Sequence, residues 1–279
     1  MLISSKINQI IDLAIAEDLG EDGDVTSNLT INQEEVINFQ ISNRQEIILC
    51  GVDFALLVFE KIDKNNKISL KKHFSDGEIL SKDDVIISGS GNARAIFAAE
   101  RIALNLIQHL SGIATKTSKF VAQLRGDTQI LDTRKTIPAF RELQKYAVKI
   151  GGGKNHRMNL YESILIKDNH IAAAGGVKKA IEKAKKAENL KIEVECDNLD
   201  QVNQLLEAGG VDVVMLDNMN LQEIEKAVKL INKKVKIEVS GNVTLEKIAA
   251  ISDLGVDYIS VGALTHSIEA VDIGLDIIS

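Results

Sequence analysis

Residues 211–240 read VDVVMLDNMNLQEIEKAVKLINKKVKIEVS, a stretch whose pattern indicates the fold class. Its two ends, 211–217 and 235–240, are short runs rich in β-branched residues, which are typical of buried strands. Between them, 221–231 has apolar residues at helical spacing, which predicts an amphipathic helix. A strand, a helix and a second strand in this order predict a right-handed crossover between parallel strands. The stretch therefore predicts a parallel sheet covered by helices.

The same alternation runs from about residue 129 to residue 264. A doubly wound sheet and a closed barrel both fit this pattern. Polar residues follow almost every strand, and a barrel explains this better because all of its strand ends contribute to one site. We therefore predict an α/β fold, an incomplete α/β barrel of about six parallel strands, over residues 111–269. The other four strands are expected at 129–136, 163–167, 191–195 and 258–261, with a further helix at 176–187.

The preceding part of the chain has a different pattern, which predicts a separate N-terminal α+β sandwich domain over residues 1–110. A helix is expected at 7–18 and strands near 36–42 and 68–73, and the C-terminal segment 270–279 is a candidate to join this domain. A helix at 95–113 carries a polar stripe that includes Arg101, and we expect it to lead into the barrel.

The composition excludes several classes of protein. Lys and Arg number 33 against 40 Asp and Glu in 279 residues, and the net charge of −7 argues against a basic nucleic-acid binder. The most apolar stretch, 47–59, is too short to cross a bilayer. Cys50 and Cys196 match no disulfide framework or zinc-site spacing, so a reducing compartment is the default. We expect a cytoplasmic protein that binds neither nucleic acid nor membrane.

Charged side chains lie at the predicted strand ends, among them Lys167, Glu195 and Asp217. Because alternate residues of a strand share a face, Glu193 and Glu195 point to the same side. Barrel interiors normally hold bulky apolar residues, so ionisable groups that point inward predict a ligand pocket. The alternative is that the strands are registered the other way and the charges pair with the surrounding helices.

The segment 134–167 is strongly basic in an otherwise acidic chain. Its eight Lys and Arg residues and two Glu residues have a local balance of +6, which leaves −13 for the rest of the chain and predicts a site for a small polyanion. A Gly triplet at 151–153 lets the backbone approach a ligand, and His156 and Arg157 follow it. A lone histidine is more often structural, but this position favours a site residue. For Lys145 and Lys149, solvated surface charge is the simpler interpretation.

Two loops after the last strands suggest a phosphate site. Ser240-Gly241-Asn242 and Gly262-Ala263 each open a helical pattern, and late-strand loops of barrels commonly hold phosphate through backbone N–H groups. Glu195 and Asp217, on neighbouring strands, are suited to bind Mg2+ or to accept hydrogen bonds from sugar hydroxyls. Together with the basic segment, these features suggest a phosphorylated sugar donor.

Longer motifs occur in a fixed order over nearly the entire chain. They are Glu17 to Gly20, Gly23 to Thr26, Glu100-Arg101, Leu104-Asn105, Leu110 to Thr115, Thr133 to Pro138, Lys145 to Ala147, Gly151 to Gly153, His156-Arg157, Leu165 to His170, Glu193 to Glu195, Leu216 to Asn218, Glu238 to Gly241 and Ser260 to Ala263. This set resembles the quinolinate phosphoribosyltransferase family.

The resemblance implies an enzyme of NAD biosynthesis, a pentosyl transferase. It implies transfer of phosphoribose from phosphoribosyl pyrophosphate to the ring nitrogen of quinolinate, with Mg2+ as cofactor, and loss of the carboxylate next to that nitrogen. The products are then nicotinate mononucleotide, pyrophosphate and CO2. It also implies a homodimer, or a higher homo-oligomer, in which Arg101 reaches the neighbouring subunit's site.

The resemblance also assigns residues to roles. Quinolinate is a dianion and arginine pairs well with carboxylates, so Arg134 and Arg157 are the expected anchors. Lys135, Lys167, Glu195 and Asp217 are the expected catalytic residues, and Glu195 and Asp217 also the expected metal ligands. The expected substrate-binding set is Arg101, Thr133, Arg134, Lys135, His156, Arg157, Lys167, Glu195, Asp217, Ser240, Gly241, Asn242, Gly262 and Ala263.

The chain departs from the family pattern at two places, where Ala139 and Asn159 replace a common Gly. A further question concerns Arg134 and Lys135, because a regular strand would send adjacent side chains to opposite faces. Either the strand ends before them, or one of the two serves another role.

Three other functions fit parts of the pattern. A related pyrophosphorylase-like protein associated with molybdate transport shares many of the motifs and need not use quinolinate. An aldolase-like barrel would use Lys167 as a Schiff-base nucleophile. A metabolite-binding module would keep the fold without turnover, although every charged position assigned above is present in this chain.

Overall fold

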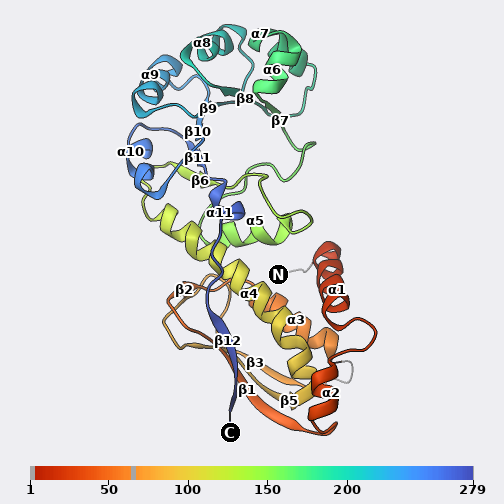
Figure 1. The fold of residues 1–279 in the computed structure, drawn as a ribbon. Helices are drawn as coiled ribbons and strands as arrows, with labels where there is room; N and C mark the ends of the chain where they lie inside the picture. Colours follow the sequence, from red (N-terminus) through yellow and green to blue (C-terminus); the bar gives the residue numbers. More distant parts are fainter. Residues whose placement is uncertain (1–3, 64–66, 279) are drawn as a thin grey trace. The chain divides into compact units, whose positions relative to one another are not determined.

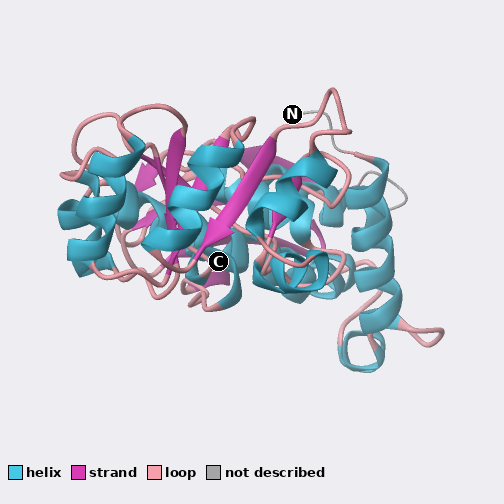
Figure 2. Ribbon diagram, turned by 90° about the horizontal axis from the view of Figure 1, so that it is seen from above, coloured by secondary structure: helices cyan, strands magenta, loops and turns pink. Residues whose placement is uncertain are grey.

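The computed structural model describes residues 4–63 and 67–278. The chain divides into two compact units, each of which combines helices with strands (Figure 2). The first unit comprises residues 1–118, 136–152 and 267–279, and the second comprises 119–135 and 153–266. None of the helices that the structure describes is both long and apolar enough to span a bilayer.

The second unit is built on a six-stranded parallel sheet, as predicted (Figure 1). Its strand order is β6-β11-β10-β9-β8-β7, so that β6 and β7 form the edges of the described sheet and the barrel is incomplete. An isolated parallel bridge from Leu131 to Lys154 extends the pairing beyond β6. The strands are β6 (Gln129–Leu131), β7 (Ile164–Ile166), β8 (Ile192–Cys196), β9 (Val213–Asp217), β10 (Lys236–Ser240) and β11 (Tyr258–Ser260).

Helices follow the strands and lie along the outer side of the sheet (Figure 1). Polar N-caps begin two of them: the Asn198 side chain accepts a hydrogen bond from Gln201 N–H, and Asn220 forms a capping box with Glu223. The helices are α6 (Asp168–Ala174), α7 (Val177–Ala184), α8 (Leu199–Ala208), α9 (Leu221–Ile231), the 3-10 turn η1 (Leu245–Lys247), α10 (Ile248–Ser252) and α11 (Ala263–His266).

Strand β8 is buried along its whole length. Ile192, Val194 and Cys196 point to one face, and Glu193 and Glu195 point to the other because side chains alternate along a strand. The apolar face packs into the core under the helices, so the carboxylates face the inner side of the sheet. The inward registration expected from the sequence is therefore the one found.

The first unit contains the antiparallel sheet β12-β1-β5-β3. Its core includes Phe39 and Phe59, whose rings stack with centroids 5.6 Å apart. The strands are β1 (Val36–Asn43), β3 (Ser69–Lys72), β5 (Val85–Asn92) and β12 (Ile273–Ile278), with the short pair β2 (Ile47–Ile48) and β4 (Ile79–Leu80). The helices are α1 (Ser5–Leu19), α2 (Val25–Thr30), α3 (Val52–Ile62), α4 (Ala93–Val121) and α5 (Arg141–Ile150).

The compact units differ from the expected domains 1–110 and 111–269. Strand β12 pairs with β1, so residues 273–278 extend the N-terminal sheet, in agreement with the expectation for segment 270–279. Residues 111–118 and 136–152 also belong to the first unit. One reason is the close packing of α5 on α4, where a Cβ on Gly151 would lie 2.4 Å from the carbonyl oxygen of Ala114. Helical periodicity does not show such a long-range contact.

The Gly triplet therefore has a role that differs from the expected approach to a ligand. Gly151 lets α5 pack on α4, since its absent Cβ would also lie 2.6 Å from Thr117 Cβ. Gly152 has a φ of +89°, in the left-handed region that glycine adopts without steric cost. Lys145, interpreted as surface charge, is completely buried, whereas Lys149 is exposed as expected.

Ala139, one of the two departures from the family pattern, has a φ of +64°. A non-glycine residue in this region is strained by about 1–2 kcal/mol. We expect Ala139→Gly to raise the free energy of unfolding by up to about 1 kcal/mol, because relief of strain outweighs the larger entropy of the unfolded chain. Asn159, the second departure, is not among the described non-glycine residues with positive φ.

Urea unfolding of the Ala139→Gly variant and the wild type measures this difference. Ala173→Gly is a suitable control, because Ala173 is exposed within α6 and glycine there should destabilise the protein by about 1 kcal/mol. If both substitutions destabilise the protein equally, backbone strain at residue 139 is not relieved by glycine.

Candidate active site

Polar residues from five strands meet at one edge of the parallel sheet. The carboxyl ends of parallel strands lie at the same edge, and β7 to β11 are followed there by site candidates. Strand β9 lies between β8 and β10. Its Asp217 is in register with Ser240 of β10, and its Met215 is in register with Glu195 of β8. The residues that the sheet brings to this edge are Lys167, Glu195, Asp217, Ser240 and Gly262.

Lys167 and Glu195 form an ion pair across neighbouring strands. Lys167 Nζ lies 2.8 Å from Glu195 Oε2, and Glu195 is only 7% exposed. Removing Lys167 would leave the buried Glu195 carboxylate without its partner, whereas Lys167 itself is about half exposed. The pair directs the lysine side chain towards the Glu195 carboxylate at the rim of the site.

Glu195 also belongs to a cluster of three carboxylates. Glu195, Asp197 and Asp217 each offer an oxygen, and the three oxygens lie within 4.8 Å of one another. Carboxylate oxygens are the ligands that Mg2+ prefers in proteins, so this donor set fits a hard divalent cation. Sequence reasoning identified Glu195 and Asp217 but missed Asp197, which follows β8 directly. The feature of the sequence that indicates Asp197 is its position two residues after Glu195.

Asn218 connects Asp217 to the predicted phosphate loop. Its Nδ2 donates to Asp217 Oδ2 at 2.6 Å, its Oδ1 accepts from Asn242 Nδ2 at 3.1 Å, and its backbone N–H donates to the Ser240 carbonyl at 3.1 Å. Asn218, Gly241 and Asn242 all have positive φ, and a Cβ on Gly241 would lie 2.2 Å from Asn218 Oδ1. Gly241 is thus required for this close approach. The sequence motif included Asn218 but assigned it no role.

Lys135 lies over the other predicted phosphate loop. Its carbonyl oxygen accepts a hydrogen bond from Thr265 Oγ1 at 2.9 Å, and its Cδ is 3.1 Å from the position of a Cβ on Gly262. Thr133 Oγ1 accepts from the Lys135 backbone N–H at 3.0 Å. Strand β6 ends at Leu131, so strand alternation does not separate Arg134 from Lys135.

The segment after the Gly triplet is anchored to the end of β6 by Asp132, which is completely buried. Asp132 Oδ1 accepts from the His156 backbone N–H at 2.8 Å, and Oδ2 accepts from Asn155 Nδ2 at 2.5 Å. Sequence reasoning missed Asp132, although it directly precedes the Thr133 motif. These bonds determine where His156 and Arg157 enter the site.

The two predicted arginine anchors lie close enough to influence each other. Partial burial lowers the pKa of the Arg157 guanidinium, and the positive charge of Arg134 lowers it further, whereas Glu193 opposes both effects. Arg157 Nη1 donates to the carbonyl oxygen of Ser163 at 2.9 Å. Two neighbouring guanidinium groups repel each other unless an anion joins them, so their proximity favours a dianionic ligand.

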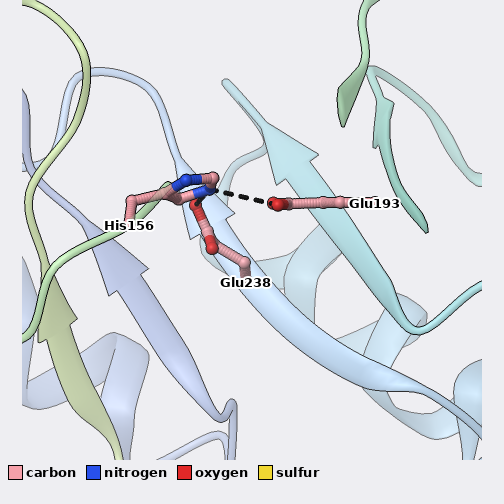
Figure 3. Close-up of side chains that lie close together, drawn as sticks. All are labelled: His156, Glu193 and Glu238. Carbon is pink, nitrogen blue, oxygen red and sulfur yellow. Dashed lines mark ion pairs between the residues drawn. The ribbon is translucent and has the colours of Figure 1, made fainter. Parts of the chain in front are cut away.

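His156 faces two buried carboxylates on the inner side of the sheet (Figure 3). Its Nε2 lies 3.1 Å from Glu193 Oε2 and 3.7 Å from Glu238 Oε1. Burial, together with the nearby Glu193 charge, raises the pKa of Glu238 to about 8, although His156 opposes the change. Glu238 therefore retains its proton at neutral pH.

Arg101, the remaining predicted site residue, belongs to the first unit. It lies on α4 with 61% of its side chain exposed, and it lines a pocket of about 380 Å³ within that unit together with Glu17, Asp18 and His109. Burial lowers the pKa of His109. The Arg101 side chain is thus available at the surface of its own unit.

Comparisons with known proteins agree with this geometry. Residues 24–111 match the family described as "Quinolinate phosphoribosyl transferase, N-terminal domain", and residues 113–276 match its C-terminal domain. A probable nicotinate-nucleotide pyrophosphorylase (carboxylating) of Bacillus subtilis is 41% identical over 275 residues, which are 98% of this chain and 93% of that protein. A protein of the same name from Methanocaldococcus jannaschii is 43% identical to this chain over 268 residues, which are 92% of each of the two proteins.

A solved structure gives the same result. The crystal structure of nicotinate-nucleotide pyrophosphorylase from Ehrlichia chaffeensis covers 100% of both chains with a TM-score of 0.94 and 42% sequence identity. A second one, from Francisella tularensis, has a TM-score of 0.91 and 44% identity over 98% of this chain and 96% of its own. By family match, sequence identity and fold, this chain belongs to the quinolinate phosphoribosyltransferase family.

Proposed function

We propose that this protein transfers phosphoribose from phosphoribosyl pyrophosphate to quinolinate with loss of CO2, and so forms nicotinate mononucleotide and pyrophosphate for NAD biosynthesis. Membership of the family supports this reaction. The structural observation that supports the reaction best is that two neighbouring arginines, Arg134 and Arg157, occur in the same unit as the carboxylate cluster at the strand ends. One group suits a dianion and the other suits a metal-bound, phosphorylated sugar.

The quinolinate carboxylates would bind to the basic side of the site. Arg134 and Arg157 would each donate paired hydrogen bonds to a carboxylate, and Thr133 and Lys167 would complete the contacts. Lys167 already neutralises Glu195 at 2.8 Å, so it is held at the boundary between the two substrates. This arrangement would direct the ring nitrogen towards the carboxylate cluster.

Glu195 and Asp217 would act at the sugar's anomeric carbon. Positive charge develops there as the bond to pyrophosphate breaks, and carboxylates held nearby stabilise that charge without reorganisation. Glu195, Asp197 and Asp217 would hold Mg2+, which when bound neutralises charge on the departing pyrophosphate. The ion pair with Lys167 restricts Glu195 to a single direction.

The ribose 5-phosphate would bind to the two late loops. Ser240, Gly241 and Asn242 form a turn with positive φ at Gly241 and Asn242, and its backbone N–H groups would donate to the phosphate oxygens. Gly262 and Ala263 form the second loop, and Lys135 beside Gly262 adds a positive charge. Lys135 would thereby orient the sugar phosphate while the anomeric carbon faces the quinolinate nitrogen.

Decarboxylation follows from the first step. Once the ring nitrogen is alkylated, the pyridinium stabilises the electron pair left on the adjacent ring carbon when the C–C bond to the carboxylate breaks. That carbon then takes up a proton from water, which gives nicotinate mononucleotide and CO2. A carboxylate that is about to leave as CO2 loses charge, so the arginine holding the other carboxylate must keep the ring in place. Arg157, fixed to Ser163 at 2.9 Å, is suited to this task.

The assembly and location belong to the same proposal. The protein would be a cytoplasmic homodimer, or a higher homo-oligomer, in which Arg101 completes the partner's quinolinate site. The exposed Arg101 side chain supports this arrangement. The acidic net charge of −7 supports the absence of a nucleic-acid partner, and the partners are then the two small substrates and a second copy of the chain.

The reaction is tested by incubating the purified protein with quinolinate, phosphoribosyl pyrophosphate and Mg2+. We expect nicotinate mononucleotide and CO2 in equal amounts, with no product when any one component is omitted or Mg2+ is chelated. Borohydride treatment in the presence of a carbonyl compound should not trap Lys167. A folded protein that forms neither product would contradict the assignment and leave a binding module as the alternative.

A mixing experiment tests the shared site. Arg101→Ala and Arg157→Ala should each lose most activity, because each removes one cation from every site. When the two are mixed, subunit exchange should create heterodimers with one intact site and restore up to about a quarter of the wild-type activity, as random pairing requires. Two differently tagged copies report the exchange. Complete exchange without recovery would disprove the sharing of Arg101.

A further inference from the structure

We propose that Glu193 is a positioning residue that acts through His156, by holding the imidazole in its Nε2–H form so that Nδ1 remains available to the backbone of Arg157. This inference deepens the proposed function, on which its kinetic part rests. In it, His156 is a neutral hydrogen-bond link between the inner face of the sheet and the substrate anchor Arg157.

The hydrogen bonds of the imidazole determine its tautomer. The Arg157 backbone N–H donates to His156 Nδ1 at 2.7 Å, and a backbone N–H can only donate. Nδ1 must therefore accept and carries no proton in this arrangement. A neutral imidazole then has its proton on Nε2, the nitrogen that faces Glu193 Oε2 at 3.1 Å.

Of the two carboxyl groups near Nε2, Glu193 is the better acceptor. It is closer, at 3.1 Å against 3.7 Å for Glu238. Glu238 is 2% exposed, and with its pKa raised to about 8 it is protonated at neutral pH. Glu193 Oε1 and Glu238 Oε1 are both buried, and neither has a hydrogen-bond partner among the described groups. A proton on Glu238 that is donated to Glu193 would give these two oxygens a hydrogen bond.

The consequence reaches the substrate side through Arg157. Its backbone is held by His156, and its guanidinium is held by the Ser163 carbonyl at 2.9 Å. If the ring changed to the Nδ1–H form, two N–H groups would face each other and the Arg157 backbone would have to move. A small displacement of a charged anchor weakens its paired hydrogen bonds with a carboxylate.

The test compares two variants of Glu193. Glu193→Gln keeps an oxygen that accepts from Nε2–H, whereas Glu193→Met has similar length but no strong acceptor. The first readout is 15N NMR of the histidine rings at pH 7.5, with the His156 signals assigned by their loss in His156→Asn. We expect an Nε2–H ring in the wild type and in Glu193→Gln, and a mixture of tautomers in Glu193→Met.

The second readout separates KM from kcat. In Glu193→Met we expect the KM for quinolinate to rise at least tenfold, with a smaller change in kcat and an unchanged KM for phosphoribosyl pyrophosphate. Glu193→Gln should stay within about threefold of the wild type, since the acceptor is retained. Glu207→Gln, an exposed substitution on α8, is the control and should change neither readout.

Three outcomes would overturn the inference. One is an Nδ1–H or doubly protonated His156 in the wild type. Another is an unchanged tautomer in Glu193→Met. The third is an equal rise in the KM for quinolinate in Glu193→Gln and Glu193→Met, which would mean that the charge and not the acceptor matters. If Glu193→Met does not fold, the wild type and Glu193→Gln still decide. The NMR readout needs no turnover, so failure of the proposed reaction is distinguished from failure of this inference.

Discussion

Asp217→Asn is expected to lower kcat/KM by at least about 100-fold, the scale on which preorganised charge at a reacting centre contributes to catalysis. Asp217 ends β9 beside Glu195 and Asp197, so the substitution removes one negative charge from the carboxylate cluster. The amide oxygen can still accept the hydrogen bond from Asn218. The fold and the phosphate loop should therefore be preserved, and the loss should come from metal affinity and from stabilisation of the anomeric carbon.

Steady-state kinetics at several Mg2+ concentrations measure this effect, with thermal unfolding as a check on the fold. The apparent Mg2+ requirement of Asp217→Asn should rise, because a carboxylate ligand has become a neutral amide. Asp253→Asn is the matched control, since Asp253 lies at the surface in an ion pair with Arg125. Near-normal activity of Asp217→Asn with an unchanged Mg2+ requirement would exclude Asp217 from the metal site.

Glu238→Gln is expected to change how stability depends on pH. The pKa of Glu238 is raised from 4.5 to about 8 in the folded protein, so the folded state binds the proton more tightly than the unfolded state. Below about pH 4.5 the group costs nothing, and between about pH 4.5 and 8 the wild type loses stability as pH rises. Gln resembles the protonated acid and does not titrate. Each pKa unit corresponds to about 1.4 kcal/mol, so the effect is a few kcal/mol across this range.

Urea unfolding of both proteins at pH 5, 7 and 9 measures the difference. The free energy of unfolding of Glu238→Gln relative to the wild type should increase from pH 5 to about pH 8 and then level off. Glu207→Gln, at an exposed ion pair with Lys178, should show no such trend. A constant difference between Glu238→Gln and the wild type would show that Glu238 is ionised throughout, which its burial beside Glu193 makes costly.

The sequence predicted most of the second unit because local patterns there agree with the tertiary fold. The six β-branched runs became β6 to β11, and alternation along β8 correctly placed Glu193 and Glu195 on one inner face. The strand 129–136 was predicted too long, since β6 ends at Leu131. That early end is what frees Arg134 and Lys135 from strand alternation.

The sequence was less informative where contacts are long-range. It indicated no strand at 85–92 or 273–278, which are β5 and β12, although both pair with β1. Lys145 was interpreted as surface charge and is completely buried. Gly151 was attributed to ligand approach, whereas its backbone packs on Ala114. Local periodicity contains no information about which distant segment covers a residue.

The succession of strands and helices along the chain, the basic segment and the carboxylates at the strand ends could all be predicted from the sequence, because periodicity and charge are properties of neighbouring residues. Three contacts became visible in the folded chain: Asp197 joins Glu195 and Asp217, Asn218 bridges Asp217 to Asn242, and His156 faces Glu193 and Glu238. These contacts join residues from different strands and loops. They exist only when the sheet aligns those strand ends, so no local pattern could specify them.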